Sequence, residues 1–98
     1  MKSLTPAQRQ HLKGLAHGLQ PVVMIGNQGL TSAVLKEVDL ALNAHELIKI
    51  KAASDEPDTR RAWLEEICAT TGAAPVQQIG KVLVIYRPAA KPVITLPS

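Results

Sequence analysis

Apolar residues recur at helical spacing near the beginning of the chain. Thr5, Pro6 and Gln8 form a capping-box pattern with proline at the first helical position, so we expect a helix to begin at Pro6. Gly18 predicts its end, because glycine readily adopts the left-handed conformation that closes a helix. The helix has apolar residues at Leu12, Leu15, Ala16 and Leu19, and a basic stripe at Arg9, Lys13 and His17 along its opposite side.

The run Pro21-Val22-Val23-Met24-Ile25 predicts a short strand. Because every residue in it is apolar, we expect both of its faces to be buried. Gly26-Asn27-Gln28-Gly29 ends the strand, and a second helix is predicted over about residues 31–43. The apolar residues of this helix gather on one face, at Leu30, Val34, Val38 and Leu42.

Residues 47–52 alternate, which predicts a strand with Ile48 and Ile50 on one side and Lys49 and Lys51 on the other. A turn at 54–58 then begins a third helix. We expect that helix to run to about residue 71, to stop at Gly72, and to bury Leu64, Ile67 and Cys68.

The last third of the chain predicts a hairpin and a tail. Strands at 76–79 and 82–86 are joined by Gly80-Lys81, where glycine suits the first position of a type II′ turn. Three prolines from residue 88 onward predict an irregular tail, with a short extended piece at 93–96.

The predicted element order is therefore α-β-α-β-α-β-β. Two β-α-β crossovers in this order indicate an α/β fold in which a mixed four-stranded sheet is packed with three helices. A chain of 98 residues can bury roughly 64% of its surface on folding, which is enough for one core. We expect a single domain over residues 1–98.

Composition narrows the classes of function. Trp63 and Tyr86 are the only aromatic residues, so a surface that stacks several bases on aromatic rings is not expected. One cysteine excludes an internal disulfide and a cysteine-rich zinc site, and the three histidines lack metal-ligand spacing. No apolar run is long enough to cross a bilayer. We expect a cytoplasmic protein with no metal, cofactor or membrane partner.

The net charge of +3 is unevenly distributed. Residues 1–29 and residues 67–98 each carry three Lys or Arg residues and no acid, whereas all eight acids lie within 30–66. If the two ends meet in space, they form a basic face that could hold a polyanion. Short basic termini that only favour solubility are the other interpretation.

The loop Gly26-Asn27-Gln28-Gly29 lies between a strand and the beginning of a helix. Its glycines allow another backbone to approach closely, and the helix N-terminus offers free N–H groups to an anion. A phosphodiester backbone could lie there, as it does on the GXXG loop of KH domains. Taken alone, the spacing favours a tight turn that simply needs glycine.

The lysines and the basic stripe also have two interpretations each. Arg9, Lys13 and His17 could be part of a binding face or could simply be solvated. Lys49 and Lys51 could contact a polyanion or could protect an edge strand from aggregation.

The sequence has no recognisable active site. Glu65 and Glu66 are adjacent on a helix and diverge by about 100°, so they cannot act as a facing pair. No lysine followed by serine or threonine comes after the second glycine of the loop, which argues against a nucleotide-phosphate site. We expect Cys68 to be buried and inert, and we expect no enzymatic activity and no small-molecule substrate.

Taken together, five segments of the sequence resemble a CRM domain (chloroplast RNA splicing and ribosome maturation) of the stand-alone bacterial, YhbY-like type. The resemblance extends over about residues 4–97. It is carried by Gln10-His11-Leu12-Lys13-Gly14-Leu15-Ala16-His17, by the run from Pro21 to Thr31, by His45-Glu46-Leu47-Ile48-Lys49-Ile50-Lys51, by Thr71-Gly72-Ala73, and by the run from Ile79 to Pro88.

The resemblance implies an RNA-binding fold similar to the C-terminal domain of translation initiation factor 3, and association with precursors of the large ribosomal subunit. It implies an RNA surface at Gly26, Asn27, Gln28 and Gly29, with Arg9, Lys13 and His17 as neighbours. Some members carry a basic residue inside the loop, whereas Asn27 and Gln28 are neutral. Attraction of phosphate would then depend on backbone N–H groups and flanking bases.

We therefore expect a monomeric, non-enzymatic protein that binds ribosomal RNA and assists assembly of the large subunit. The predicted RNA-binding residues are Arg9, Lys13, His17, Gly26, Asn27, Gln28, Gly29, Lys49 and Lys51. The alternative is an adaptor that docks on a ribosomal or assembly protein through its acidic third helix or its lysine strand.

Overall fold

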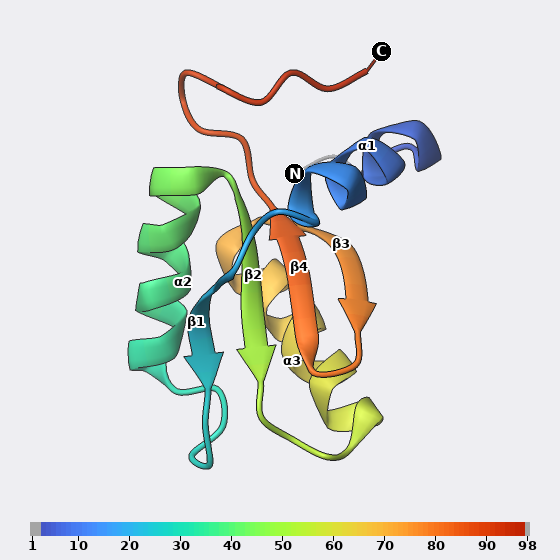
Figure 1. Ribbon diagram of the computed structural model, residues 1–98. Helices are drawn as coiled ribbons and strands as arrows, with labels where there is room; N and C mark the ends of the chain where they lie inside the picture. Colours follow the sequence, from blue (N-terminus) through green and yellow to red (C-terminus); the bar gives the residue numbers. More distant parts are fainter. Residues whose placement is uncertain (1–2, 98) are drawn as a thin grey trace.

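The computed structural model describes residues 3–97 and has the predicted element order (Figure 1). Its elements are α1 (Pro6–Ala16), β1 (Pro21–Ile25), α2 (Ser32–His45), β2 (Leu47–Ala52), α3 (Pro57–Thr71), β3 (Ala74–Ile79) and β4 (Val82–Tyr86). The α/β class and the three-helix, four-strand composition predicted from the sequence are confirmed.

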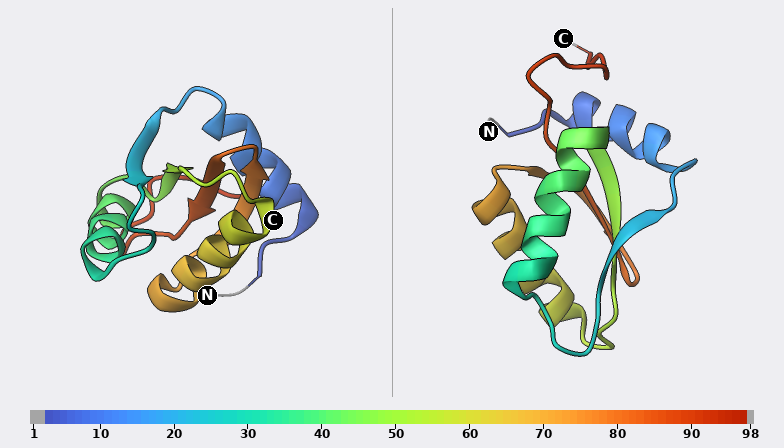
Figure 2. Two further views of the ribbon diagram at one scale, coloured as in Figure 1. Left: turned by 90° about the horizontal axis from the view of Figure 1, so that it is seen from below. Right: turned by 90° about the vertical axis from the view of Figure 1, so that its left-hand side faces the viewer.

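The four strands form one mixed sheet in the order β1-β2-β4-β3. β1 and β2 are parallel, and β4 is antiparallel to both of its neighbours. α2 connects β1 to β2 and α3 connects β2 to β3, so both crossovers advance in the same direction across the sheet. Because both crossovers are right-handed, the two helices lie on the same face of the sheet. Figures 1 and 2 show α2 and α3 behind the sheet and α1 on the other side.

Three helix ends follow the signals in the sequence, but the prediction that Gly18 ends α1 in the left-handed conformation is wrong, because α1 is capped by His17 in the right-handed conformation and φ of Gly18 is not positive. The side chain of Thr5 accepts the N–H of Gln8, and the side chain of Gln8 accepts the N–H of Thr5, which completes the predicted capping box. Thr31 caps α2 by accepting the N–H of Val34. Gly72 ends α3 in the left-handed conformation, with φ of +76°.

Each face of the sheet has its own hydrophobic core. The first core lies between the sheet and α2 and α3, and it includes Ile25, Val38, Ile50, Ile67 and Leu83, all fully buried. The second core lies under α1 and contains Leu12, Ala16, Leu47, Val76, Val84 and Tyr86, with Ile94 and Leu96 packed against it. Leu15 and Leu19, which we expected on the apolar side of α1, are instead exposed.

The expectation that β1 is buried on both faces is wrong. β1 is an edge strand, and only Val23 and Ile25 point into a core. The side chains of Val22 and Met24 are 50% and 59% exposed. A run of apolar residues indicates that a strand can be buried on both sides, but the strand's position in the sheet decides whether anything covers it.

The hairpin and the tail differ from expectation in detail. The φ angles agree with the predicted type II′ turn, which requires positive φ at its first central residue only: Gly80 has φ of +53°, and φ of Lys81 is not positive. β3 begins at Ala74 rather than residue 76, and an irregularity between Pro75 and Gln77 shifts its register. The tail over 87–97 contains no strand, so residues 93–96, where we expected a short extended piece, do not join the sheet.

A buried glutamate fastens this tail. The carboxylate of Glu46 accepts N–H groups from Ala89, Val93 and Ile94 at 2.7, 2.9 and 3.0 Å. Burial alone would raise the pKa of the Glu46 carboxyl, but the three backbone donors outweigh it and hold that pKa below its ordinary value. The tail is therefore tied to the end of α2 by a charge that the fold keeps ionised.

Candidate nucleic-acid interface

Lys49 and Lys51 lie on the face of the sheet that α1 only partly covers. The alternation along β2 points Leu47, Lys49 and Lys51 to this face, opposite to the fully buried Ile48 and Ile50. Leu47 is covered in the second core, Lys49 is half-buried, and Lys51 is exposed. The strand therefore emerges from beneath α1 and carries its two ammonium groups onto the open part of the face.

The basic stripe of α1 borders this open part. Lys13 and His17 line a hollow of about 80 Å³ together with Lys49, Gln77 and Ile79. Arg9 continues the stripe one turn further along the helix and does not line the hollow. Two of the three stripe residues therefore converge with a lysine of the sheet.

The loop over residues 26–29 is a tight turn at the opposite end of β1. The N–H of Gly29 donates to the carbonyl of Gly26 at 3.0 Å, and Gly29 has φ of +74°. A Cβ atom at Gly29 would lie 3.7 Å from Cζ2 of Trp63 in α3. Gly26 has no such constraint, because its φ lies outside the left-handed range and a Cβ there would meet nothing within 4 Å. The second glycine is thus required by the turn, and the first is not.

The beginning of α2 follows the loop directly. Thr31 satisfies the N–H of Val34, which leaves the first-turn N–H groups of Ser32 and Ala33 without an intrahelical acceptor. The first turn of α2 contains no acidic residue to compete for them. Asn27 and Gln28 are exposed at the tip of the turn. This end of the molecule can accept an anion through backbone N–H groups and the helix dipole.

The stripe and the loop do not adjoin each other. β1 begins near the end of α1 and leads to Gly26, and five strand residues extend about 17 Å. Figure 1 shows α1 at the upper end of the sheet and the loop below the lower end of β1. The implied placement of Arg9, Lys13 and His17 as direct neighbours of the loop is therefore corrected.

Lys49 and Lys51 occupy the space between the stripe and the loop. Lys49 pairs in register with Pro21, Lys51 with Met24, and Ala52 with Ile25, the residue that precedes the loop. The basic groups thus follow one line from the end of α1, along β2, to the turn at Gly26.

The sheet order also decides between the two interpretations of these lysines. β2 is an interior strand, hydrogen-bonded to β1 on one side and to β4 on the other. Protection of a free strand edge is therefore not their role.

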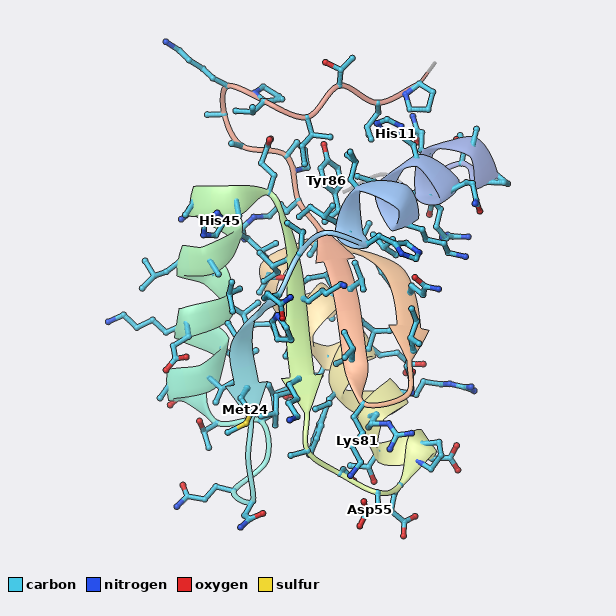
Figure 3. All side chains as sticks on the ribbon, viewed as in Figure 1. His11, Met24, His45, Asp55, Lys81 and Tyr86 are labelled. Atoms are coloured by element: carbon cyan, nitrogen blue, oxygen red, sulfur yellow. The ribbon has the colours of Figure 1, made fainter. Side chains whose placement is uncertain are left out.

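The C-terminal basic residues contribute less than their number suggests. Lys81 forms an ion pair with Asp55 at 2.7 Å, which Figure 3 shows at the lower end of the hairpin. Arg87 binds Asp39 at 2.7 Å and also donates to the carbonyl of Thr71 and to the side chain of Asn43. Both cations have partners in α2, α3 or the loop before α3. The basic face therefore combines α1, from the N-terminal end of the chain, with β2, from its middle, and Lys81 and Arg87 do not contribute to it.

Sequence reasoning missed the apolar side chains beside the lysines. Met24 on β1 and Ile79 on β3 are exposed on the same face, on either side of Lys51. The alternation in 47–52 identified the lysines. No local signal identified Met24, because an apolar run does not show which of its sides stays open.

Nothing in the described part of the chain indicates catalysis or metal binding. Residues 3–97 contain no group of three or more His, Cys, Asp or Glu side chains placed to hold a metal ion. Burial raises the pKa of the Cys68 thiol to about 11, which agrees with the expectation of an unreactive cysteine. Among the same residues, no helix is both long and apolar enough to span a membrane.

Comparison with known proteins places this arrangement in a family. Residues 4–87 match the CRS1 / YhbY (CRM) domain. The chain belongs to the CRM domain family. The resemblance inferred from the sequence blocks is thereby confirmed.

Similar proteins of comparable length come from several bacteria. An RNA-binding protein of Haemophilus influenzae is 50% identical over 97 residues, which are 99% of this chain and 98% of that protein. A probable RNA-binding protein of Pseudomonas aeruginosa is 47% identical over 90 residues, or 92% and 86% of the two chains. The solution structure of a Staphylococcus aureus protein, described as a candidate RNA-binding protein, superimposes with a TM-score of 0.85 at 34% identity, covering 96% of this chain and 99% of that one.

Proposed function

We propose that this protein binds RNA through its sugar-phosphate backbone, without enzymatic activity. The observation that carries the proposal is the position of Lys49 and Lys51 on an interior strand at the open sheet face, between the α1 stripe and the loop at Gly26. Membership of the CRM family, and relatives that are named RNA-binding proteins, support it.

The charges suit a polyanion that follows the line from α1 to the loop. Lys13 and Lys49 meet at the hollow, Lys51 lies one pair of residues further along β2, and the N–H groups of α2 follow the turn. Each lysine contributes a mobile point charge, whereas the turn and helix contribute fixed backbone N–H groups that can donate to a phosphate oxygen. Asn27 and Gln28 in the loop carry no charge, so in this proposal the lysines of the sheet supply the positive charge that attracts phosphate.

We further propose that the RNA is ribosomal. In this proposal the protein acts as a cytoplasmic monomer, associates with precursors of the large ribosomal subunit and assists their assembly. The proposal rests on the family resemblance, which implies this association, and on the acid-free character of the four strands.

The salt dependence of binding tests the backbone contact. For about four neutralised phosphates, the logarithm of the affinity for single-stranded RNA should fall with the logarithm of salt concentration at a slope of about −3. Lys49→Glu and Lys51→Glu should each weaken binding and make the slope less steep. Lys36→Glu is the matched control, because Lys36 is exposed on α2, on the other side of the sheet. Equal effects of all three variants would show that only net charge matters and would overturn the proposed site.

Co-sedimentation with ribosomal particles tests the partner. Nuclease treatment of a cell extract should release the protein from particles of the large subunit if RNA holds it there. Persistence after nuclease treatment would instead support the adaptor function, in which α3 or the lysine strand docks on a protein.

A further inference from the structure

Four residues form a row across the open face of the sheet. Met24 on β1 pairs in register with Lys51 on β2, Lys51 pairs with Val82 on β4, and Val82 pairs with Ile79 on β3. Met24 and Ile79 are 59% and 54% exposed, and Val82 is half-buried. We call Met24, Val82 and Ile79 the apolar row. Ile79 also lines the hollow at Lys13 and Lys49, and Met24 lies on the side of the face toward the loop.

The apolar row is an unusual surface for a protein with two well-formed cores. Met24 and Ile79 are exposed, whereas Val82 also packs against the second core, so the two outer side chains of the row are the ones open to a partner. Exposed apolar groups gathered on one face mark a binding surface more often than single ones do. Figure 3 shows Met24 on the open side of β1, above the loop.

The charge around the apolar row selects a negatively charged partner with apolar surface. No acidic residue occurs in any of the four strands, and Asp55, which lies at the end of the hairpin, is paired with Lys81. An RNA strand has both required features, because its phosphates are anionic and the faces of its bases are apolar. In a duplex the bases are stacked and paired, so only a single strand can turn its bases toward a flat protein surface.

We propose that the apolar row is a base-contact surface that makes the protein selective for single-stranded RNA. This inference rests on the proposed RNA-binding function. The phosphates lie along Lys49, Lys51 and the turn at Gly26, and unstacked bases cover Met24 on one side and Ile79 on the other. Contact with aliphatic side chains does not distinguish one base from another, so the preference is for strandedness rather than for sequence.

Salt titration separates the base contacts from the phosphate contacts. The probes are a twelve-nucleotide oligouridylate, an RNA duplex of twelve base pairs, and inorganic polyphosphate. Met24→Thr and Ile79→Thr remove apolar surface but keep good strand formers. Leu40→Gln is the control, because Leu40 on α2 is also 59% exposed and lies behind the sheet. Thermal unfolding of each variant accompanies the titrations.

The expected result is a parallel displacement of the salt plot for oligouridylate. Covering on the order of 40 Å² of apolar side chain is worth about a fivefold change in affinity, so each threonine variant should bind about fivefold more weakly at every salt concentration. The slope should stay that of the wild type, and binding of polyphosphate should not change. The wild type should prefer oligouridylate to the duplex, and Leu40→Gln should behave as the wild type does.

The outcomes distinguish this inference from the function on which it rests. Unchanged oligouridylate affinity in both threonine variants, or equal wild-type affinity for strand and duplex, would overturn the base-contact surface and leave backbone binding intact. A wild-type protein that binds none of the RNA probes would overturn both. If the wild-type association with ribosomal particles survives nuclease treatment and Met24→Thr abolishes that association, the apolar row docks on a protein. This outcome also overturns the base-contact surface.

Discussion

The two glycines of the loop at residues 26–29 should respond in opposite ways to substitution by alanine. Gly29 has φ of +74°, where a residue with a Cβ atom costs about 1–2 kcal/mol. Its new Cβ would lie 3.7 Å from Trp63, an ordinary contact that adds no clash. Gly26 lies outside the left-handed range and has free space, so alanine there should stabilise the protein by about 0.4–1 kcal/mol through the unfolded chain.

The gain through the unfolded chain is common to both variants, so the free energies of unfolding of Gly26→Ala and Gly29→Ala should differ by about 1–2 kcal/mol, with Gly29→Ala the less stable. For a domain of this size that corresponds to a difference in Tm of roughly 4–16 °C. Circular dichroism would measure the unfolding of the whole chain. Fluorescence of Trp63, the only tryptophan, would report on the loop that it contacts.

The same pair isolates the functional role of the loop. Gly26→Asp places a carboxylate in the loop that leads to α2, and we expect it to weaken RNA binding while unfolding stays cooperative. Gly29 cannot serve this purpose, because any side chain there also strains the turn. Equal Tm values for the two alanine variants would refute the assigned turn conformation. Wild-type RNA affinity in a folded Gly26→Asp protein would remove the loop from the interface.

Two further predictions concern buried ionisable groups. Because the folded state lowers the pKa of Glu46, Glu46→Gln should cost about 2 kcal/mol of unfolding free energy at pH 7. The difference from wild type should shrink as the pH falls below 4.5, which urea unfolding at pH 7 and pH 3 would show. A loss of equal size at both pH values would contradict a role for the charge. Cys68, with a pKa raised to about 11, should react with iodoacetamide at pH 8 on the order of 100-fold more slowly in the folded protein than in the urea-unfolded chain. Mass spectrometry would measure both rates, and comparable rates would show that the thiol is not shielded.

The elements of this fold could be predicted because their signals are local. The capping box at Thr5, the left-handed Gly72 and the turn glycine at Gly80 each act within a few residues, and each is found where the sequence placed it. The alternation in residues 47–52 likewise assigned Lys49 and Lys51 to the correct side of β2.

The order of strands could not be predicted in the same way, and it decided what the site is. An apolar run such as 21–25 is compatible with a central or an edge strand, since only long-range pairing makes the difference. The sheet order exposes Met24 at the edge and places the lysines in the interior. The partners of Lys81 and Arg87 are 26 and 48 residues away in sequence, so no local pattern shows that these charges are already paired.

The open face follows from the dimensions of the elements. Both crossover helices lie on one side of the sheet, which leaves α1 alone to cover the other side, and α1 packs across β2, β3 and β4. A helix is about 10–12 Å wide with its side chains, whereas strands of five or six residues are about 17–20 Å long. One helix laid across such strands leaves roughly 5–10 Å of each strand uncovered, which is about one row of side chains on that face. Lys51 lies in this open row and the half-buried Lys49 lies at its border with α1, on strands without a single acid. The modest net charge of +3 is therefore concentrated on the one surface that the topology cannot cover, and this concentration is what makes the face suitable for a polyanion.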